Sequence, residues 1–205
     1  MCIRDRVIAE AGGFVSSNIH SPISGTVASV DLAVNGNGLR QPAITIKREG
    51  DDWAEGIDLS KDVVRECKLD SKQIIAKIQA AGIVGMGGAT FPTHVKLSVP
   101  PGKKAEFLII NGVECEPYLT TDCREMLECS DTIISGITAV MKYCEIPHCI
   151  IGIERNKPEC IDLLTSLTRE MKGVEVKGLP MRYPQGAEKT LVETCLLYTS
   201  PSPRD

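Results

Sequence analysis

The chain has 205 residues, of which 42% are hydrophobic, so it is long enough to bury a core in one large or two small domains. Its 23 basic and 27 acidic residues give a net charge of −4, so its electrostatics favour no nucleic-acid partner. No apolar run approaches the ~20 residues that span a bilayer, so we expect no direct transmembrane segment and membrane contact only through a partner.

Both ends of the chain depart from the pattern of their neighbours. Residues 1–6 read MCIRDR, and residues 196–205 read LLYTSPSPRD. Both strings resemble translated sequencing-adapter read-through, so we interpret them as foreign and leave them out of the fold prediction. On this interpretation the chain is an internal fragment of a longer protein. An ordinary disordered terminus is the alternative at either end.

Residues 7–50 form a predicted small all-β module. The strand-like pieces GFVSS, GTVASVDLAV and AITIKR are separated by turn signals at 21–25 and 35–38. The stretch HSPISGTV resembles the entry hairpin of the barrel-sandwich hybrid fold of lipoyl and biotinyl carriers. A carrier displays a lysine at a hairpin tip, whereas the NGNG tip has none and Lys47 lies at a strand end. We therefore favour a structural module, followed by a polar connector at 51–70 that Trp53 anchors.

Residues 71–195 form a predicted α/β domain, because helical and strand patterns alternate along it. A parallel sheet covered by helices is the expected result. The predicted helices are 71–82, 130–145, 157–173 and one beginning at 186, and the predicted strands are 106–112, 148–154 and 174–179.

Three polar stretches lie where such a sheet binds ligands, beyond strand carboxyl ends or in loops that enter helices. They are GIVGMGGATFPTHVK at 82–96, NGVECEPY at 111–118 and RYPQGAEK at 182–189. We expect them to converge on one ligand. The nine cysteines contain no C-x-x-C pair, so we expect scattered buried thiols, Cys115 among them, and no metal site.

The glycine-rich stretch suggests an anion site. Gly85, Gly87 and Gly88 allow backbone N–H groups to approach a phosphate, and Lys96 adds a cation. Phe91 is suited to stack on a planar ring. The alternative is a simple turn, since the stretch is neither a Walker loop nor G-x-G-x-x-G.

In the second stretch, Asn111 follows a buried strand. Glu114 and Glu116 flank Cys115 and could accept hydrogen bonds from ribose hydroxyls or an amide N–H. A solvated acidic loop is the alternative.

Taken together, the three stretches resemble one component of the Rnf ion-translocating ferredoxin:NAD oxidoreductase family, the subunit designated by the letter C. More distantly, they resemble the FMN-binding, NADH-oxidising 51 kDa subunit of respiratory complex I. The resemblance covers residues 7 to about 195. It implies an α/β, parallel-sheet flavin-binding domain, preceded by the barrel-sandwich-hybrid module, that takes a hydride from NADH.

The resemblance also implies roles for individual residues. Those implied for FMN are Gly85, Gly87, Gly88 and Lys96 around the phosphate and ribityl chain, Asn111 and Glu114 facing the flavin, and Tyr183, Gly186 and Glu188 in the third stretch. Phe91 and Glu116 are implied for NADH. Val113, Ala187 and His94 depart from the complex I pattern, and His94 receives no catalytic role. No catalytic acid or base is expected, because hydride transfer to flavin needs none.

Further features of the family lie beyond this chain. The resemblance implies two four-cysteine 4Fe-4S clusters C-terminal to the flavin domain, and partner subunits of a membrane electron-transport complex at the cytoplasmic face of the cell membrane. Two other functions stay open. One is a cobalamin reductase-like flavoprotein of bacterial microcompartments, and the other is a non-catalytic docking subunit with an empty flavin pocket.

Overall fold

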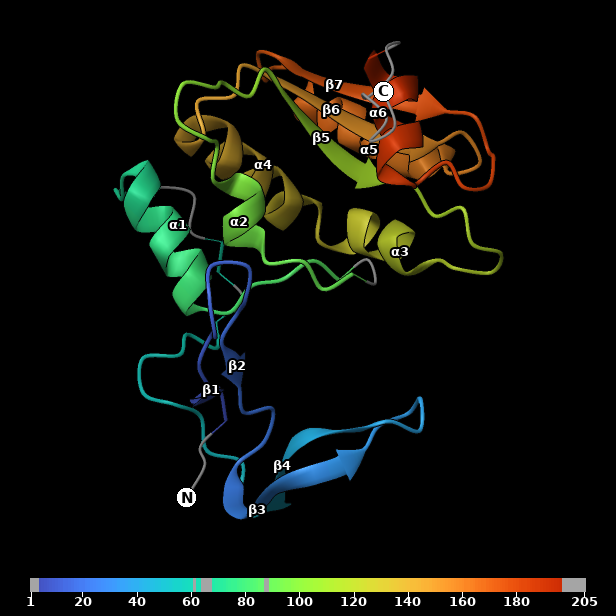
Figure 1. Ribbon diagram of the computed structural model, residues 1–205. Helices are drawn as coiled ribbons and strands as arrows, with labels where there is room; N and C mark the ends of the chain where they lie inside the picture. Colours follow the sequence, from blue (N-terminus) through green and yellow to red (C-terminus); the bar gives the residue numbers. More distant parts are fainter. Residues whose placement is uncertain (1–3, 61, 64–67, 87–88, 197–205) are drawn as a thin grey trace. The chain divides into compact units, whose positions relative to one another are not determined.

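The computed structural model describes residues 4–60, 62–63, 68–86 and 89–196. The chain folds into two compact units (Figure 1), and it passes between them after residues 61, 71 and 98. The first unit holds the β module and the glycine-rich stretch, and the second holds the other two polar stretches. Among the described residues, no helix combines the length and apolar character needed to cross a bilayer.

The first unit is built from two antiparallel strand pairs. β1 (Val7–Ala9) pairs with β2 (Ile19–His20), and β3 (Gly25–Val34) pairs with β4 (Arg40–Arg48). At the hairpin tip, Asn35 Oδ1 accepts the N–H groups of Asn37 and Leu39, both at 3.0 Å. Gly38 has a φ of 77°, which glycine adopts without strain. The NGNG prediction of a turn between antiparallel strands is confirmed.

The prediction of a strand at GFVSS is wrong. The Ala11 N–H donates to Asn18 Oδ1 at 3.0 Å, and the Gly12 N–H donates to Ser16 Oγ at 3.2 Å. These bonds hold the segment in an irregular loop, since asparagine and serine side chains compete with neighbouring strands for backbone donors.

Residues near the N-terminus contribute to the first unit, although the sequence pattern led us to leave them out. The Arg4 N–H donates to Asp52 O at 3.0 Å, and its guanidinium lies 4.7 Å from the centre of the Trp53 ring. The Asp5 N–H donates to Ser21 O at 2.8 Å. Trp53 therefore anchors the connector against Arg4. The foreign origin of residues 1–6 stays a hypothesis.

α1 (Ser71–Ala80) ends where the sequence predicts. Gly82 has a φ of 66°, and the Ile83 N–H reaches back to Ile78 O at 3.3 Å. This is the left-handed glycine that commonly closes a helix. A Cβ at this position would lie 2.5 Å from Asn18 O, so only glycine fits. α2 (Thr93–Leu97) was not predicted.

The second unit contains the predicted parallel sheet, in the order β5-β6-β7 (Figure 1). The strands are Phe107–Gly112, His148–Glu154 and Val174–Leu179. The helices are α3 (Thr121–Glu128), α4 (Ser130–Tyr143), α5 (Pro158–Thr168) and α6 (Glu188–Leu196). α3 was not predicted, and α5 ends earlier than the sequence suggested.

Both faces of β6 are buried, as expected for the central strand of a parallel sheet. Its side chains at 149, 151 and 153 pack with residues of α3, α4 and α5. Ile150 packs on the opposite face with Leu179 of β7 and Leu191 of α6. The sheet is therefore covered on both sides, and its carboxyl ends are left for the polar stretches.

Candidate functional site

The glycine-rich stretch forms a narrow, hairpin-like loop in the first unit. Val84 bridges to Pro92 in the antiparallel sense, the Gly85 N–H donates to Phe91 O at 2.9 Å, and the Thr93 N–H donates to Ile83 O at 3.0 Å. Gly85 thus uses its N–H to close the loop. The predicted phosphate contacts of Gly87 and Gly88 lie outside the described residues.

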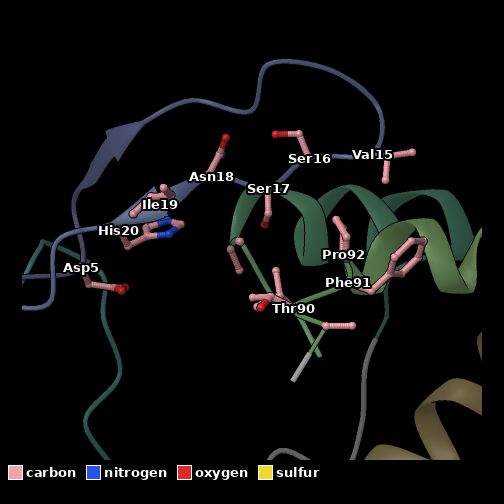
Figure 2. A pocket seen from close by; sticks show the side chains of 14 residues that line it. Asp5, Val15, Ser16, Ser17, Asn18, Ile19, His20, Thr90, Phe91 and Pro92 are labelled. Atoms are coloured by element: carbon pink, nitrogen blue, oxygen red, sulfur yellow. The ribbon is translucent and has the colours of Figure 1, made fainter. Parts of the chain in front are cut away.

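A cavity of about 730 Å³ lies in the first unit between this loop and residues 15–20 (Figure 2). Its volume is in the range of small-molecule pockets. Thr90 and Phe91 line one side, and Asn18 and His20 line the other. Phe91 is 41% exposed, so its ring is available to a ligand as predicted. Lys96 is exposed on α2 and does not line this cavity.

His94 has a structural position in the first unit. Its side chain is buried, and Nε2 lies 3.0 Å from Phe14 O. The Phe14 ring meets the imidazole edge-on, with ring centres 5.9 Å apart. His94 therefore fastens α2 to the loop of residues 11–18.

Asn111 joins two of the polar stretches within the second unit. Its Nδ2 donates to Gly186 O at 3.0 Å, and its Oδ1 accepts the Val113 N–H at 3.2 Å. Asn111 lies near the carboxyl end of β5, and Gly186 lies between β7 and α6. The predicted convergence is therefore present for these two stretches.

Glu114 is buried and bonded within the protein. Oε1 accepts the Asp122 N–H at 2.7 Å, and Oε2 accepts the Cys123 N–H at 3.1 Å, so the carboxylate caps α3. Lys157 Nζ lies 3.2 Å from Oε2. Burial lowers the pKa of Lys157, but the hydrogen bond and charge of Glu114 outweigh burial and raise it. The predicted flavin contact of Glu114 stays a prediction.

The remaining predicted residues of the second unit are at its surface. Glu116 and Glu188 are exposed, and Tyr183 is 71% exposed. Glu188 opens α6, where an acidic side chain complements the helix dipole. These three side chains are accessible to a ligand.

Sequence reasoning missed Glu154, the last residue of β6. Its side chain is only 1% exposed, and neither carboxylate oxygen has a hydrogen-bond partner among the described residues. Burial raises the pKa of Glu154; the Arg182 N–H and the Lys157 charge oppose this increase, and the Glu114 charge adds to it. The signal in the sequence is a carboxylate that directly ends the apolar run HCIIGI.

The position of Glu154 bears on the fit of a flavin. Ligands of α/β proteins bind outside the carboxyl ends of the strands, and Glu154 ends the central one. An unpartnered buried acceptor costs free energy until a donor reaches it. The ring N–H and ribityl hydroxyls of FMN are donors of this kind. The second unit therefore fits the polar edge of FMN.

Comparison with known families identifies this architecture. Residues 78–204 match the family model of the Nuo51 FMN-binding domain. The chain belongs to the Nuo51 FMN-binding domain family. Residues 3–51 match the RnfC barrel sandwich hybrid domain, so the predicted fold of the β module is confirmed as well.

Curated relatives of the chain are subunits of ion-translocating oxidoreductase complexes. The chain is 46% identical over 191 residues to a subunit of the proton-translocating ferredoxin:NAD(+) oxidoreductase complex of Clostridium ljungdahlii, which covers 92% of this chain and 41% of the relative. It is 37% identical over 185 residues to a subunit of the Na(+)-translocating ferredoxin:NAD(+) oxidoreductase complex of Acetobacterium woodii, covering 90% and 41%. It is 40% identical over 197 residues to a subunit of the ion-translocating oxidoreductase complex of Rhodobacter capsulatus, covering 94% and 37%.

All three relatives carry the same designation within their complexes, the letter C. The resemblance inferred from the three polar stretches is therefore confirmed. This Nuo51 FMN-binding domain protein spans about two fifths of the length of these relatives, at 41%, 41% and 37%. The relatives' names specify protons in one case and Na⁺ in another.

Proposed function

We propose that the chain is the flavin-binding part of an electron-transfer oxidoreductase subunit. It binds FMN, exchanges a hydride with NAD(H), and passes electrons towards 4Fe-4S clusters elsewhere in the subunit. Its partners are other subunits of an ion-translocating complex at the cytoplasmic face of the membrane. The family match and the relatives' names support this proposal. The structural observation that carries it is the Asn111–Gly186 hydrogen bond, which joins two flavin-type stretches at one edge of the sheet.

The chain's own groups bind and orient in this proposal. Asn111 fixes the loop after β5 against the loop before α6, and Glu154 offers an acceptor to a donor on the ligand. Lys96 and the backbone of Gly87 and Gly88 bind the phosphate. FMN, when bound, supplies the exchange of a hydride equivalent for single electrons. The chain then needs no general acid or base, only distance and orientation.

Two more groups of residues have assigned places. Tyr183, Gly186 and Glu188 border the flavin, and Phe91 and Glu116 contact NADH. Gly85 shapes the phosphate loop, because its N–H bond to Phe91 O sets the loop width.

The test is reconstitution of the full chain with FMN under anaerobic conditions. We expect the flavin fluorescence to be quenched on binding and the flavin absorbance to bleach when NADH is added. Asn111→Ala should weaken FMN binding by about tenfold, the equivalent of one good hydrogen bond. Asn37→Ala, at the exposed hairpin tip, is the matched control. A folded chain that leaves FMN fluorescence unchanged contradicts the proposal.

One observation favours a docking subunit without flavin as the second candidate. Glu114 and the Gly85 N–H, both predicted to face FMN, are already bonded within the protein. The same FMN titration separates the two functions, because a docking subunit would not quench the flavin.

A further inference from the structure

Two cysteines separated by 37 residues meet in the core of the second unit, next to a glutamate. Cys123 lies in the first turn of α3, and Cys160 lies in the first turn of α5. Their sulfur atoms are 3.4 Å apart. Glu159 Oε1 lies 3.7 Å from Cys123 Sγ. One ligand atom of each residue lies within 4.8 Å of the others.

These separations match the edges of a metal-centred tetrahedron. With Zn–S bonds of about 2.3 Å and Zn–O bonds of about 2.1 Å, tetrahedral angles put two sulfurs about 3.8 Å apart and a sulfur and an oxygen about 3.6 Å apart. The observed 3.4 and 3.7 Å are within a few tenths of an ångström of these values. A disulfide would instead require the sulfurs to approach to about 2.05 Å, and it would give Glu159 no role.

The donor set selects the class of cation. Thiolate sulfur favours zinc-like cations over the hard ions Mg²⁺ and Ca²⁺. Two thiolates, one carboxylate and a divalent cation leave one negative charge. Lys157 at the start of α5 is placed to balance it, since its ammonium interacts electrostatically with both cysteines.

Access and coordination number also fit. Cys160 is fully buried and Cys123 is 6% exposed, whereas Glu159 is exposed. A cation would reach the sulfurs from the side of Glu159. Three protein ligands leave a fourth tetrahedral position, which water would fill.

We propose that Cys123, Cys160 and Glu159 form a binding site for a thiophilic divalent cation of the zinc type. The bound cation ties the first turn of α3 to the first turn of α5, directly behind the Glu114 cap. This site does not depend on flavin binding, so either proposal can fail alone.

The experiment titrates the full chain with Co²⁺, a coloured stand-in for Zn²⁺, in the presence of a thiol-free reductant and without FMN. We expect one equivalent to bind with a sulfur-to-cobalt charge-transfer band. Zn²⁺ should then displace Co²⁺, bleach the band and raise the thermal unfolding temperature, because a ligand that binds only the folded state stabilises it.

Three variants locate the site. The double substitution Cys123→Ser and Cys160→Ser should abolish the charge-transfer band. Glu159→Gln keeps both thiols and changes only a surface side chain, so it tests the site even if the serine variant fails to fold. It should weaken Co²⁺ binding by at least about tenfold, since even second-shell partners cost that much. Cys144→Ser and Glu170→Gln are the matched controls and should bind as the parent does.

Two outcomes would overturn the proposal. One is a folded, reduced chain with no charge-transfer band, including the case in which Cys123 and Cys160 are recovered as a disulfide. The other is Co²⁺ binding that Glu159→Gln and the double serine variant leave unchanged, which would assign the cation to other groups.

Discussion

At the residue scale, Glu114 shows how one carboxylate organises a functional loop. It caps α3 through two backbone N–H groups and pairs with Lys157 at the start of α5. It belongs to the stretch that also contains Asn111. The loop after β5 is therefore fixed at its beginning by Asn111 and further along by Glu114.

We expect Glu114→Ala to destabilise the second unit by about 3 kcal/mol, because it leaves the Lys157 cation buried without a partner. Urea unfolding measures this loss. Glu116→Ala, two residues away and exposed, should change the free energy of unfolding by less than about 0.5 kcal/mol. The variant with both Glu114→Ala and Lys157→Met should lose less than the sum of the single losses. Simple additivity would show that the ion pair contributes nothing.

Glu154 gives a prediction about pH. Because burial raises its pKa, the folded chain holds the Glu154 proton more tightly than the unfolded chain does. The stabilisation is fully present below the ordinary glutamate pKa of about 4.3. It is lost as the pH rises through the higher folded value. Glu154→Gln cannot ionise, so its free energy of unfolding should exceed that of the parent increasingly as the pH rises.

Urea unfolding at a series of pH values measures that difference. Glu175→Gln, on the exposed side of the neighbouring strand β7, is the control and should follow the parent at every pH. A constant difference between Glu154→Gln and the parent would mean that Glu154 is ionised throughout.

The sequence pointed to part of this site and missed the rest for a physical reason. Asn111 and Gly186 lie in stretches that follow strands, so their meeting could be expected from a parallel sheet. The bonds of Glu114 and the approach of Cys123 to Cys160 depend on how α3 packs against α5. No local pattern encodes that packing, so a search for C-x-x-C spacing could not find the thiol pair.

At the scale of secondary-structure elements, long periodic segments were predictable and short ones were not. α4, β6 and β7 carry clear helical or strand patterns and were found close to their observed bounds. α3 has few apolar residues and depends on the distant Glu114 cap, and α2 is shorter than two helical turns. GFVSS has strand composition but no partner, because side chains take its backbone donors.

The end of α1 gives a prediction at this scale. Gly82→Ala should destabilise the first unit by about 1–3 kcal/mol, from the left-handed backbone and the close approach to Asn18 O. Trp53, the only tryptophan, lies in this unit, so its fluorescence during urea unfolding measures the change. Gly36→Ala is the matched control, since a Cβ there meets nothing within 4 Å. Equal stability of the two variants would contradict the helix-end argument.

At the scale of the whole molecule, the two units differ in how their strands are protected. β6 lies between two strands and is buried on both faces, whereas β3 pairs only with β4 and is exposed along most of its length. A two-stranded sheet is marginally stable in water.

We therefore expect amide hydrogens of β6 to exchange at least about a hundredfold more slowly than those of β3 and β4. Hydrogen exchange followed by mass spectrometry of peptides measures this directly. Peptides of α1 provide an internal comparison within the first unit. Equal protection of β3 and β6 would mean that another surface covers the hairpin in solution.

The strand order of the sheet has a consequence for synthesis. β5, β6 and β7 lie side by side in the order in which the ribosome makes them. Each new strand pairs with the one that emerged before it, and no later strand must be inserted between two earlier ones. The β3–β4 hairpin closes still earlier, by residue 48. The growing chain can therefore add structure from the N-terminus onwards without breaking a strand pairing that it has already formed.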